Sequence, residues 1–280
     1  MTDLSVIILT CNEEVNLPVC LESLAGLGAE VFIVDSGSTD RTVEIAEEFG
    51  ACVVEHEFEN HAAQVNWALE NLPIKTQWVM RLDADERITG ELADELARIA
   101  SNDDAGISGY EVRRRVYFWG SWIRFGGYYP TWLLRVWRHG HGFSEQRWMD
   151  EHIVLSQGKT GRLSHDIIDE NQKGLSFWTE KHNGYADREV RDLLDLEGRA
   201  DHGKLTGQAS RKRWLKRNWY GRLPLFLRAF LYWFFRYFLL LGFLDGRSGL
   251  VFHFLQGFWY RFLVDAKLYE HKRKLKQVRL

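Results

Sequence analysis

The chain has 280 residues, of which 45% are apolar, and a formal net charge of -3. This length accommodates one large α/β domain, or one domain with an appendage, and the apolar content excludes an intrinsically disordered chain. Three cysteines lie at no metal-ligand spacing, and their odd number argues against a disulfide framework, so a reducing cytoplasm is the expected compartment. The first residues, MTDLSVIILTCNEE, have no basic segment before their short apolar run and indicate a strand rather than a signal peptide.

Short runs rich in β-branched and aromatic residues indicate four strands, over 5–10, 30–35, 51–58 and 77–83. Helical patterns separate them: one starts near Leu17 with Asn16 as its cap, and others occupy about 40–49, 61–72 and 90–100. Strands that alternate with helices predict an α/β fold with a parallel sheet and crossover helices.

After residue 105 the sequence mixes strand-like pieces with glycine pairs and many aromatic residues. We expect strands near 108–117, 132–138 and 148–155, joined by loops that build a binding surface. Residues 174–197 indicate a helix. The expected division is a main domain over 1–200 and a basic, apolar, helical and membrane-associating region over 201–280.

The second region contains the basic segment RKRWLKRNWYGR at 211–222, followed by LPLFLRAFLYWFFRYFLLLGFLDG, the most apolar part of the chain. Arg228 and Arg236 interrupt the apolar run before it reaches the roughly 20 residues of a spanning helix. The segment is therefore expected to lie in a membrane interface or to re-enter it, and basic residues on both sides favour anionic lipid. The alternative is a buried helical pair packed on the main domain.

The run at 77–83 ends in the acids of RLDADE, at Asp83, Asp85 and Glu86. Residues two apart on an extended chain point to the same side, so the two aspartates can face one point at the carboxyl end of a strand, where open parallel sheets bind ligands. Such oxygen ligands suit Mg²⁺ or Mn²⁺, which would neutralise a diphosphate. The alternative is that Asp85 or Glu86 caps the helix that starts near Thr89.

Two further strand exits carry polar turns. In VDSGSTDRT, Asp35 can accept a hydrogen bond from a base or a ribose, and Asp40 is the simplest cap of the next helix. The turn LTCNEE adds polar groups at the same sheet edge: Thr10, Asn12 and Glu14. None of these turns has a glycine-rich phosphate loop, so binding has to use side chains and a metal.

In order and approximate spacing, the stretches VIILTCNEEVNLPVCLESL, VDSGSTDRTVEIAEEFGA, NHAAQVNWAL and RLDADE resemble glycosyltransferase family 2, which has the nucleotide-sugar-binding GT-A fold. The resemblance covers residues 4 to about 155. RRRVYFWG, RVWRHG, MDEH and the apolar tail also resemble bacterial members that extend lipopolysaccharide core or exopolysaccharide, including the core β-glucosyltransferase type.

The resemblance implies roles for individual positions. The turn at Asp35 holds uracil or another base, and the pair Asp83 and Asp85 holds the metal and the donor diphosphate. Further residues expected at the nucleotide are Thr10, Asn12, Glu14, Gln64 and Asn66.

Inverting transfer also needs a carboxylate base to take the proton of the acceptor hydroxyl. The family usually supplies it from a Glu-Asp pair, whereas this chain has the order Asp150-Glu151. We favour Glu151 and keep Asp150 as the second candidate; one of them can instead be a surface partner of Arg147. His165 is a candidate third metal ligand, or a structural histidine.

Arg113, Arg114 and Arg115 are consecutive cations, and one or two of them are expected to meet phosphate on the donor or on a lipid-linked acceptor. Arg115 is the candidate for the donor, and Arg135 is a further one. Five aromatic residues can form a face on which a sugar ring stacks, although core packing explains any one of them equally well: Trp119, Trp122, Tyr128, Tyr129 and Trp132.

Together these features predict an inverting, metal-dependent glycosyltransferase at the cytoplasmic face of the inner membrane. It would use a UDP- or GDP-sugar donor and a glycan or glycolipid acceptor, with no nucleic-acid partner. One alternative is a sugar nucleotidyltransferase, which would need a glycine-rich basic phosphate loop that LTCNEEVNLP lacks. The other is a membrane-attached nucleotide-sugar-binding protein without catalysis.

Overall fold

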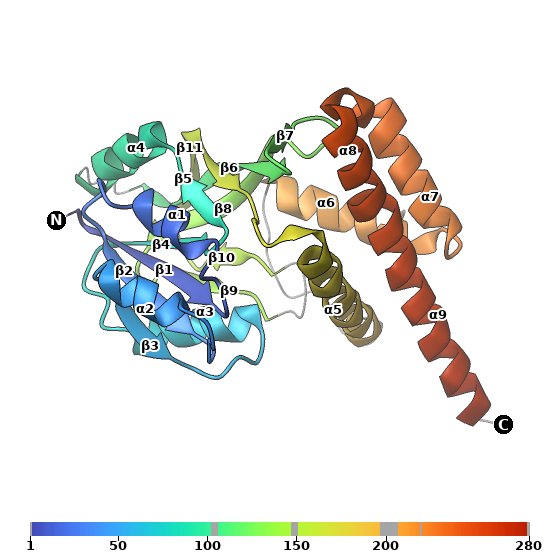
Figure 1. The fold of residues 1–280 in the computed structure, drawn as a ribbon, viewed down its shortest axis with the longest axis horizontal. Helices are drawn as coiled ribbons and strands as arrows, with labels where there is room; N and C mark the ends of the chain where they lie inside the picture. The colour runs from blue at the N-terminus through green and yellow to red at the C-terminus, as the bar shows by residue number, and fades with distance from the viewer. Residues whose placement is uncertain (1, 102–105, 147–150, 197–206, 219, 279–280) are drawn as a thin grey trace. The chain divides into compact units, whose positions relative to one another are not determined.

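The structure is a computed structural model that describes residues 2–101, 106–146, 151–196, 207–218 and 220–278 (Figure 1). The chain divides into two compact units. We call Met1–Arg115 with Trp132–Gln172 the sheet unit, and Val116–Thr131 with Lys173–Leu280 the helical unit. The domain boundary expected at residue 200 falls within 197–206, outside the described residues, and stays a prediction.

The first part of the sheet unit alternates strands and helices as the sequence predicts. Its strands are β1 (Leu4–Thr10), β2 (Glu30–Asp35), β3 (Cys52–Glu55) and β4 (Trp78–Asp83). They pair in parallel in the order β3-β2-β1-β4. The helices between them are α1 (Leu17–Glu22), α2 (Thr42–Glu48) and α3 (His61–Asn71). The α/β class with crossover helices is therefore confirmed.

Later strands extend this sheet. They are β5 (Glu86–Ile88), β6 (Ile107–Phe118), β8 (Thr131–Arg138) and β11 (Lys159–Asp169), and α4 (Gly90–Ser101) lies between the first two in sequence. Over the described ranges, the strand order is β3-β2-β1-β4-β8-β6-β11-β5, with β8 antiparallel to β4 and β5 antiparallel to β11. A separate antiparallel pair consists of β9 (Gly142–Ser144) and β10 (Ile153–Leu155).

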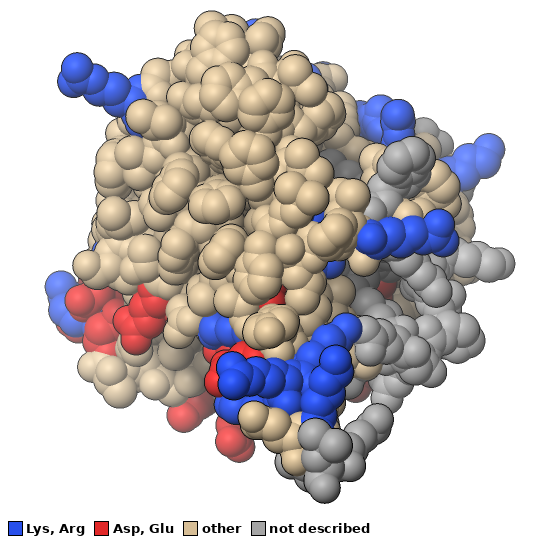
Figure 2. Space-filling view, turned by 90° about the vertical axis from the view of Figure 1, so that its right-hand side faces the viewer, with Lys and Arg blue, Asp and Glu red and all other residues tan. Residues whose placement is uncertain are grey.

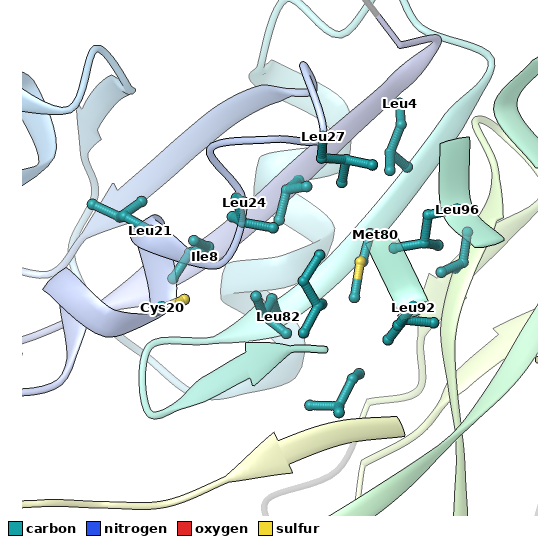
Figure 3. Packing of buried hydrophobic residues seen from close by; sticks show 14 of the residues in the cluster. Leu4, Ile8, Cys20, Leu21, Leu24, Leu27, Met80, Leu82, Leu92 and Leu96 are labelled. Carbon is teal, nitrogen blue, oxygen red and sulfur yellow. The ribbon is translucent and has the colours of Figure 1, made fainter. Parts of the chain in front are cut away.

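Both faces of the central strands are buried, which is why their sequences are almost continuously apolar. In β1, Val6 and Ile8 pack on one face with residues of α1 and α4, whereas Ile7 packs on the other face with residues of α3. Figure 3 shows the first of these clusters, where Leu21 lies near Ile8 and Leu92 lies near Met80.

Two helix starts differ from the expected ones. The side chain of Asn16 does not cap α1; its Nδ2 donates to Glu13 Oε2 at 2.7 Å and its Oδ1 accepts from Gln172 N at 2.9 Å. At α4 the cap is Thr89, whose Oγ1 accepts from Leu92 N at 3.2 Å. The interpretation of Asp85 or Glu86 as the cap is wrong, because the chain passes through β5 before the helix begins.

The helical unit consists mainly of helices, with the short strand β7 (Ser121–Ile123) paired to the end of β6. Its elements are α5 (Gly174–Leu196), α6 (Gly207–Asn218), η1 (Tyr220–Arg222), α7 (Leu227–Phe234), η2 (Phe235–Leu239), η3 (Gly242–Asp245), α8 (Gly246–Phe252), η4 (His253–Trp259) and α9 (Tyr260–Val278). A core of Ala186, Val190, Tyr260, Val264 and Leu268 joins α5 to α9.

Among the described residues no single helix is long and apolar enough to cross a membrane. One bent pair, Leu227–Leu239 with Gly242–Gln277, meets the length and composition of a span only when both arms are taken together, and its arms form an angle of 71°.

Candidate active site

The strand register brings three of the predicted polar turns to one edge of the sheet. Thr10 at the end of β1 is paired with Asp35 at the end of β2, and Leu9 is paired with Asp83 at the end of β4. Because the three strands are parallel, their carboxyl ends lie side by side, which is the usual ligand-binding edge of such sheets.

Asp35 organises the turn that follows β2. It is buried, and its Oδ1 accepts from Thr10 Oγ1 at 2.7 Å and from Ser38 Oγ at 2.6 Å. Its Oδ2 accepts the backbone N–H groups of Gly37 at 3.0 Å and Ser38 at 2.7 Å. Both oxygens thus shape the turn, and recognition of a base by Asp35 stays a prediction.

The turn after β1 is hydrogen-bonded to the turn after β2. Asn12 adopts a φ of 56°, which asparagine tolerates better than most residues, and its Oδ1 accepts from Thr39 N at 2.7 Å. Glu14 Oε2 accepts from Arg41 N at 3.1 Å. These bonds hold two of the predicted nucleotide-binding turns as one surface.

The two candidate residues of α3 have different surroundings. Gln64 is buried, and its Nε2 donates to Ser36 Oγ at 3.1 Å, next to the Asp35 turn. Asn66 instead exchanges two hydrogen bonds with the backbone of Ser144, both at 2.8 Å, and so fixes β9 to α3. The nucleotide-binding role expected for Asn66 stays a prediction, but its amide is already committed.

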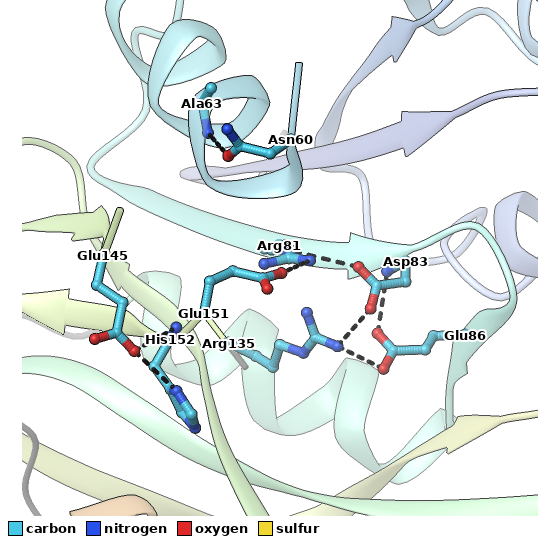
Figure 4. Close-up of polar contacts among 9 residues, drawn as sticks. All are labelled: Asn60, Ala63, Arg81, Asp83, Glu86, Arg135, Glu145, Glu151 and His152. Carbon is cyan, nitrogen blue, oxygen red and sulfur yellow. Dashed lines mark hydrogen bonds and ion pairs between the residues drawn. The ribbon is translucent and has the colours of Figure 1, made fainter. Parts of the chain in front are cut away.

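Asp83 lies in a network of charged side chains (Figure 4). Arg135, from β8, donates through Nη2 to Asp83 Oδ2 at 2.8 Å and to Glu86 Oε1 at 2.6 Å. Arg81, from β4 itself, donates to Asp83 Oδ1 at 3.3 Å. Glu86 also accepts the backbone N–H of Asp83 at 3.0 Å.

These contacts shift the pKa values of Asp83 and Glu86 in opposite directions. Burial would raise the pKa of Asp83, but the guanidinium groups of Arg135 and Arg81 outweigh it and hold the pKa well below its usual range. For Glu86, burial dominates over the attraction of Arg135 and raises the pKa to about 7. Asp83 is therefore the ionised member of the pair at neutral pH.

The favoured base, Glu151, joins the same network from a distant part of the chain. Arg81 Nη2 lies 3.4 Å from Glu151 Oε1, and the Glu151 side chain is 14% exposed. Arg81 thus contacts both Asp83 and Glu151 (Figure 4). Asp150, the second candidate, and Arg147 lie outside the described residues.

Asp83 and Asp85 suit a divalent cation by the chemistry of their donors, because both are partly exposed carboxylates at a ligand-binding edge. Asp85 Oδ2 accepts from Asn171 Nδ2 at 2.9 Å, which orients it. His165 does not complete the pair: its Nδ1 lies 2.9 Å from Glu95 Oε2. Over the described ranges no three His, Cys, Asp or Glu residues form a metal-binding group, so other ligands would be phosphate oxygens and water.

The arginine triplet is largely neutralised by strand β11. Arg113 and Arg115 lie 2.7 and 2.5 Å from the two oxygens of the buried Asp166, and Arg114 lies 3.2 Å from Asp169. Contact of Arg115 with donor phosphate stays a prediction.

The aromatic candidates divide between the two units. In the sheet unit, Trp132 lies under the guanidinium groups of Arg113 and Arg162. In the helical unit, Trp122 meets Tyr129 edge to face, Tyr128 lies 3.7 Å from the guanidinium carbon of Arg236, and Trp119 is 56% exposed.

Sequence patterns alone did not identify Arg81 and Glu86 as parts of the site. A signal was present, because Arg81 is the one charged residue inside the apolar run WVMRL. A charge in a strand buried on both faces needs a nearby counter-charge.

Comparison with known proteins agrees with these features. The model of "Glycosyl transferase family 2" matches residues 5–170. An uncharacterized glycosyltransferase of Rickettsia bellii is 36% identical over 39% of this chain and 37% of its own length, so the chain matches less than two fifths of that relative. The lipopolysaccharide core biosynthesis glycosyltransferase LpsC of Rhizobium meliloti is 33% identical over 58% of this chain and 62% of its own.

Among solved structures, Staphylococcus aureus TarS 1–349 aligns with 97% of this chain and 92% of its own, at 13% identity and a TM-score of 0.48. Glucosyl-3-phosphoglycerate synthase from Mycobacterium tuberculosis, in complex with Mn²⁺ and UDP, aligns with 41% and 44% at 22% identity and a TM-score of 0.34. Given a family match over more than half of the chain and a sheet of this topology, the chain belongs to glycosyltransferase family 2 and has its GT-A fold.

Proposed function

We propose that this protein is an inverting, metal-dependent glycosyltransferase that transfers a sugar from a UDP- or GDP-sugar to a lipopolysaccharide-type or other lipid-linked acceptor. The observation that carries the proposal is the convergence of Thr10, Asp35 and Asp83 at one sheet edge, with Glu151 linked to Asp83 through Arg81. The similarity to LpsC supports the choice of acceptor.

In this proposal the turns after β1 and β2 bind the nucleoside. Their mutual hydrogen bonds, through Asp35, Asn12 and Glu14, fix the surface before the donor arrives, so little conformational entropy is lost on binding. Asp83 and Asp85 would hold Mg²⁺ or Mn²⁺, which supplies neutralising charge to the donor diphosphate. Arg135 keeps Asp83 ionised for that task.

Glu151 is the proposed base. Its carboxylate accepts the proton of the acceptor hydroxyl while that oxygen bonds to the anomeric carbon, on the face opposite the leaving nucleoside diphosphate. The bond between the anomeric carbon and the diphosphate oxygen breaks, so the configuration inverts. Arg81 is a positioning residue, because its guanidinium group holds Glu151 and Asp83 in one network.

Calorimetric titration with UDP- and GDP-sugars, with and without Mn²⁺, tests the donor site. We expect one nucleotide to bind in a metal-dependent manner and Asp85→Ala to abolish this binding. Asp94→Ala is the matched control, since Asp94 is an exposed aspartate on α4. If neither nucleotide sugar binds, the proposed donor site is wrong.

Transfer to lipopolysaccharide-type acceptors tests the base. Glu151→Gln should leave donor affinity within about twofold and reduce turnover at least about a hundredfold, the usual share of general-base catalysis. Glu22→Gln, at an exposed position, is the control. If Glu151→Gln turns over normally while Asp150→Asn does not, Asp150 is the base. Donor binding with no transfer by the unmodified protein would indicate a binding protein.

A further inference from the structure

Helices α7 to α9 and the connecting η elements expose an unusual amount of apolar surface. Leu239 is 62% exposed, Leu244 53% and Leu250 49%. Further large apolar residues with exposed side chains recur along the same segment: Leu227, Phe230, Leu231, Phe234, Phe235, Phe238, Leu240, Leu241, Phe243, Phe254 and Phe262. A contiguous surface of this size is rare on a protein that faces water.

The polar groups of this segment are turned inward instead. Arg228 is 5% exposed and its Nε donates to the buried Asp265 at 2.7 Å. The side chain of His253 is 1% exposed, and its Nε2 lies 2.9 Å from Asp245 Oδ2. Arg236 donates through Nε to the backbone oxygen of Gly126 at 2.6 Å. With charges inside and phenylalanine and leucine outside, the outer face suits an apolar medium.

Exposed basic residues lie at both ends of the two helical arms. Arg222 precedes α7, Arg247 follows the turn between the arms, and Lys272, Arg273 and Lys274 lie near the end of α9. Residues 207–278 contain 15 Lys and Arg but only 3 Asp and Glu, although the whole chain has a formal charge of -3. Figure 2 shows a broad face almost without charged side chains, with Lys and Arg around its margins and Asp and Glu along its left and lower margins.

The length of the arms decides how they can meet a bilayer. The first arm has the eight residues of α7 and the five of η2, or about 20 Å at 1.5 Å per residue. The hydrocarbon core is about 30 Å thick, so this arm is too short to cross it. An upright hairpin would also place Arg247, beside the turn, deep in hydrocarbon, where a charge is costly.

We propose that the apolar face of α7 to α9 lies side-on in one leaflet of an anionic phospholipid bilayer, with Arg222, Arg247 and Lys272 to Lys274 at headgroup level. This proposal defines the membrane contact expected from the sequence and does not depend on the catalytic assignment. Anionic lipid is the occupant that the charges favour, since each basic residue near such a surface strengthens binding about fivefold.

A consequence concerns the segment around Gly126. Asp245 accepts the backbone N–H groups of Arg124 at 3.0 Å and Phe125 at 3.1 Å, and Leu240 O accepts from Gly126 N at 2.9 Å. A Cβ on Gly126 would lie 2.2 Å from the His253 ring. In this proposal the segment is attached to the membrane-bound helices and is held at the bilayer surface; its access to a lipid-linked acceptor there rests on the proposed function.

Vesicle flotation of the detergent-purified chain tests the lipid contact. We expect binding to phosphatidylcholine vesicles with about 30% phosphatidylglycerol, and at least about a thousandfold weaker binding to phosphatidylcholine alone, because five basic residues lose the attraction of anionic lipid. The exposed triple variant Phe235→Glu/Leu239→Glu/Leu244→Glu should lose at least about a thousandfold in affinity, because each of the three apolar side chains contributes at least about tenfold.

The control variant is Val15→Glu/Phe49→Glu, at exposed apolar positions of the sheet unit that are 45% and 37% exposed. It should bind vesicles like the unmodified chain. Equal binding of the triple variant, or a protein that forms dimers through this face and ignores lipid, would overturn the proposal. Circular dichroism confirms that each variant is folded.

Topology is tested by a membrane-impermeant maleimide added outside the vesicles. Arg247→Cys and Lys276→Cys should both be labelled from outside, with Cys11 and Cys52 as internal references read by peptide mass spectrometry. If Arg247→Cys reacts only after the vesicles are opened while Lys276→Cys reacts at once, the hairpin crosses the bilayer and the side-on arrangement is wrong.

Discussion

At the scale of single residues, Arg81 and Arg135 decide the state of the carboxylates at the end of β4. An unpaired carboxyl group at a buried strand end tends to stay protonated, because burial disfavours its charged form. Arg135, 2.8 Å from Asp83, and Arg81, 3.3 Å away, reverse this preference. Asp83 is thus ionised at neutral pH.

His182 gives a prediction at the same scale. Burial in the helical unit lowers the pKa of His182 to about 4. The hydrogen bond between His182 Nδ1 and Trp178 O, at 2.8 Å, opposes this shift but is outweighed. Its ordinary pKa is about 6.5, so the unfolded chain binds this proton first. The contribution to the free energy of unfolding is complete above pH 6.5 and is lost as the pH falls toward 4.

The pKa shift of His182 corresponds to a loss of about 3 kcal/mol in the free energy of unfolding between pH 6.5 and 4. Urea unfolding at several pH values in one detergent measures it. The variant His182→Gln has no titrating group there, so its stability should fall less steeply than that of the unmodified chain between pH 6.5 and 4. Parallel curves for the two proteins would refute the burial of a neutral imidazole.

At the scale of elements, Asn66 connects α3 to β9. Its side-chain amide makes the same two hydrogen bonds to Ser144 that a neighbouring strand would make. The arrangement satisfies the backbone of a three-residue strand whose described partner is only β10. An asparagine expected at the nucleotide is therefore occupied in holding a neighbouring part of the fold.

Replacing Asn66 with alanine should lower the free energy of unfolding by about 2 kcal/mol, since it leaves two polar groups of Ser144 unpaired. Asn71→Ala is the matched control in the same helix: its amide is exposed and makes one bond, to Trp67 O, so its effect should stay within about 0.5 kcal/mol. Donor affinity should be similar in both folded variants; a selective loss in Asn66→Ala would establish direct nucleotide contact.

At the scale of the whole molecule, the tail beyond residue 222 is part of a core as well as an apolar surface. Leu268 of α9 is 5% exposed and packs with Val190 of α5, so deletion of residues 223–280 would uncover α5. Such a truncation would aggregate whether or not the tail binds lipid. Point substitutions on the outer face are therefore the sharper test of membrane binding.

The two roles of α9 can be separated by paired leucine substitutions. Leu268→Ala should destabilise the helical unit by about 2–5 kcal/mol, as expected for a buried leucine. Leu275→Ala, at a position 46% exposed, should change stability by less than about 0.5 kcal/mol. Thermal unfolding in detergent measures both; equal effects would show that α9 does not pack on α5.

The sequence by itself determined the alternation of strands and helices and the polar turns at the strand ends, because these follow from local propensity and short-range patterns. It also indicated Asp83 as a site residue and the resemblance to glycosyltransferase family 2. Only the tertiary structure decided which charges meet: Arg135 lies 52 residues from Asp83 in sequence, and Glu151 lies 70 residues from Arg81. Which side chains pair across a sheet depends on the order of its strands. That order is set by the packing of residues distant in sequence, so no local sequence pattern contains it.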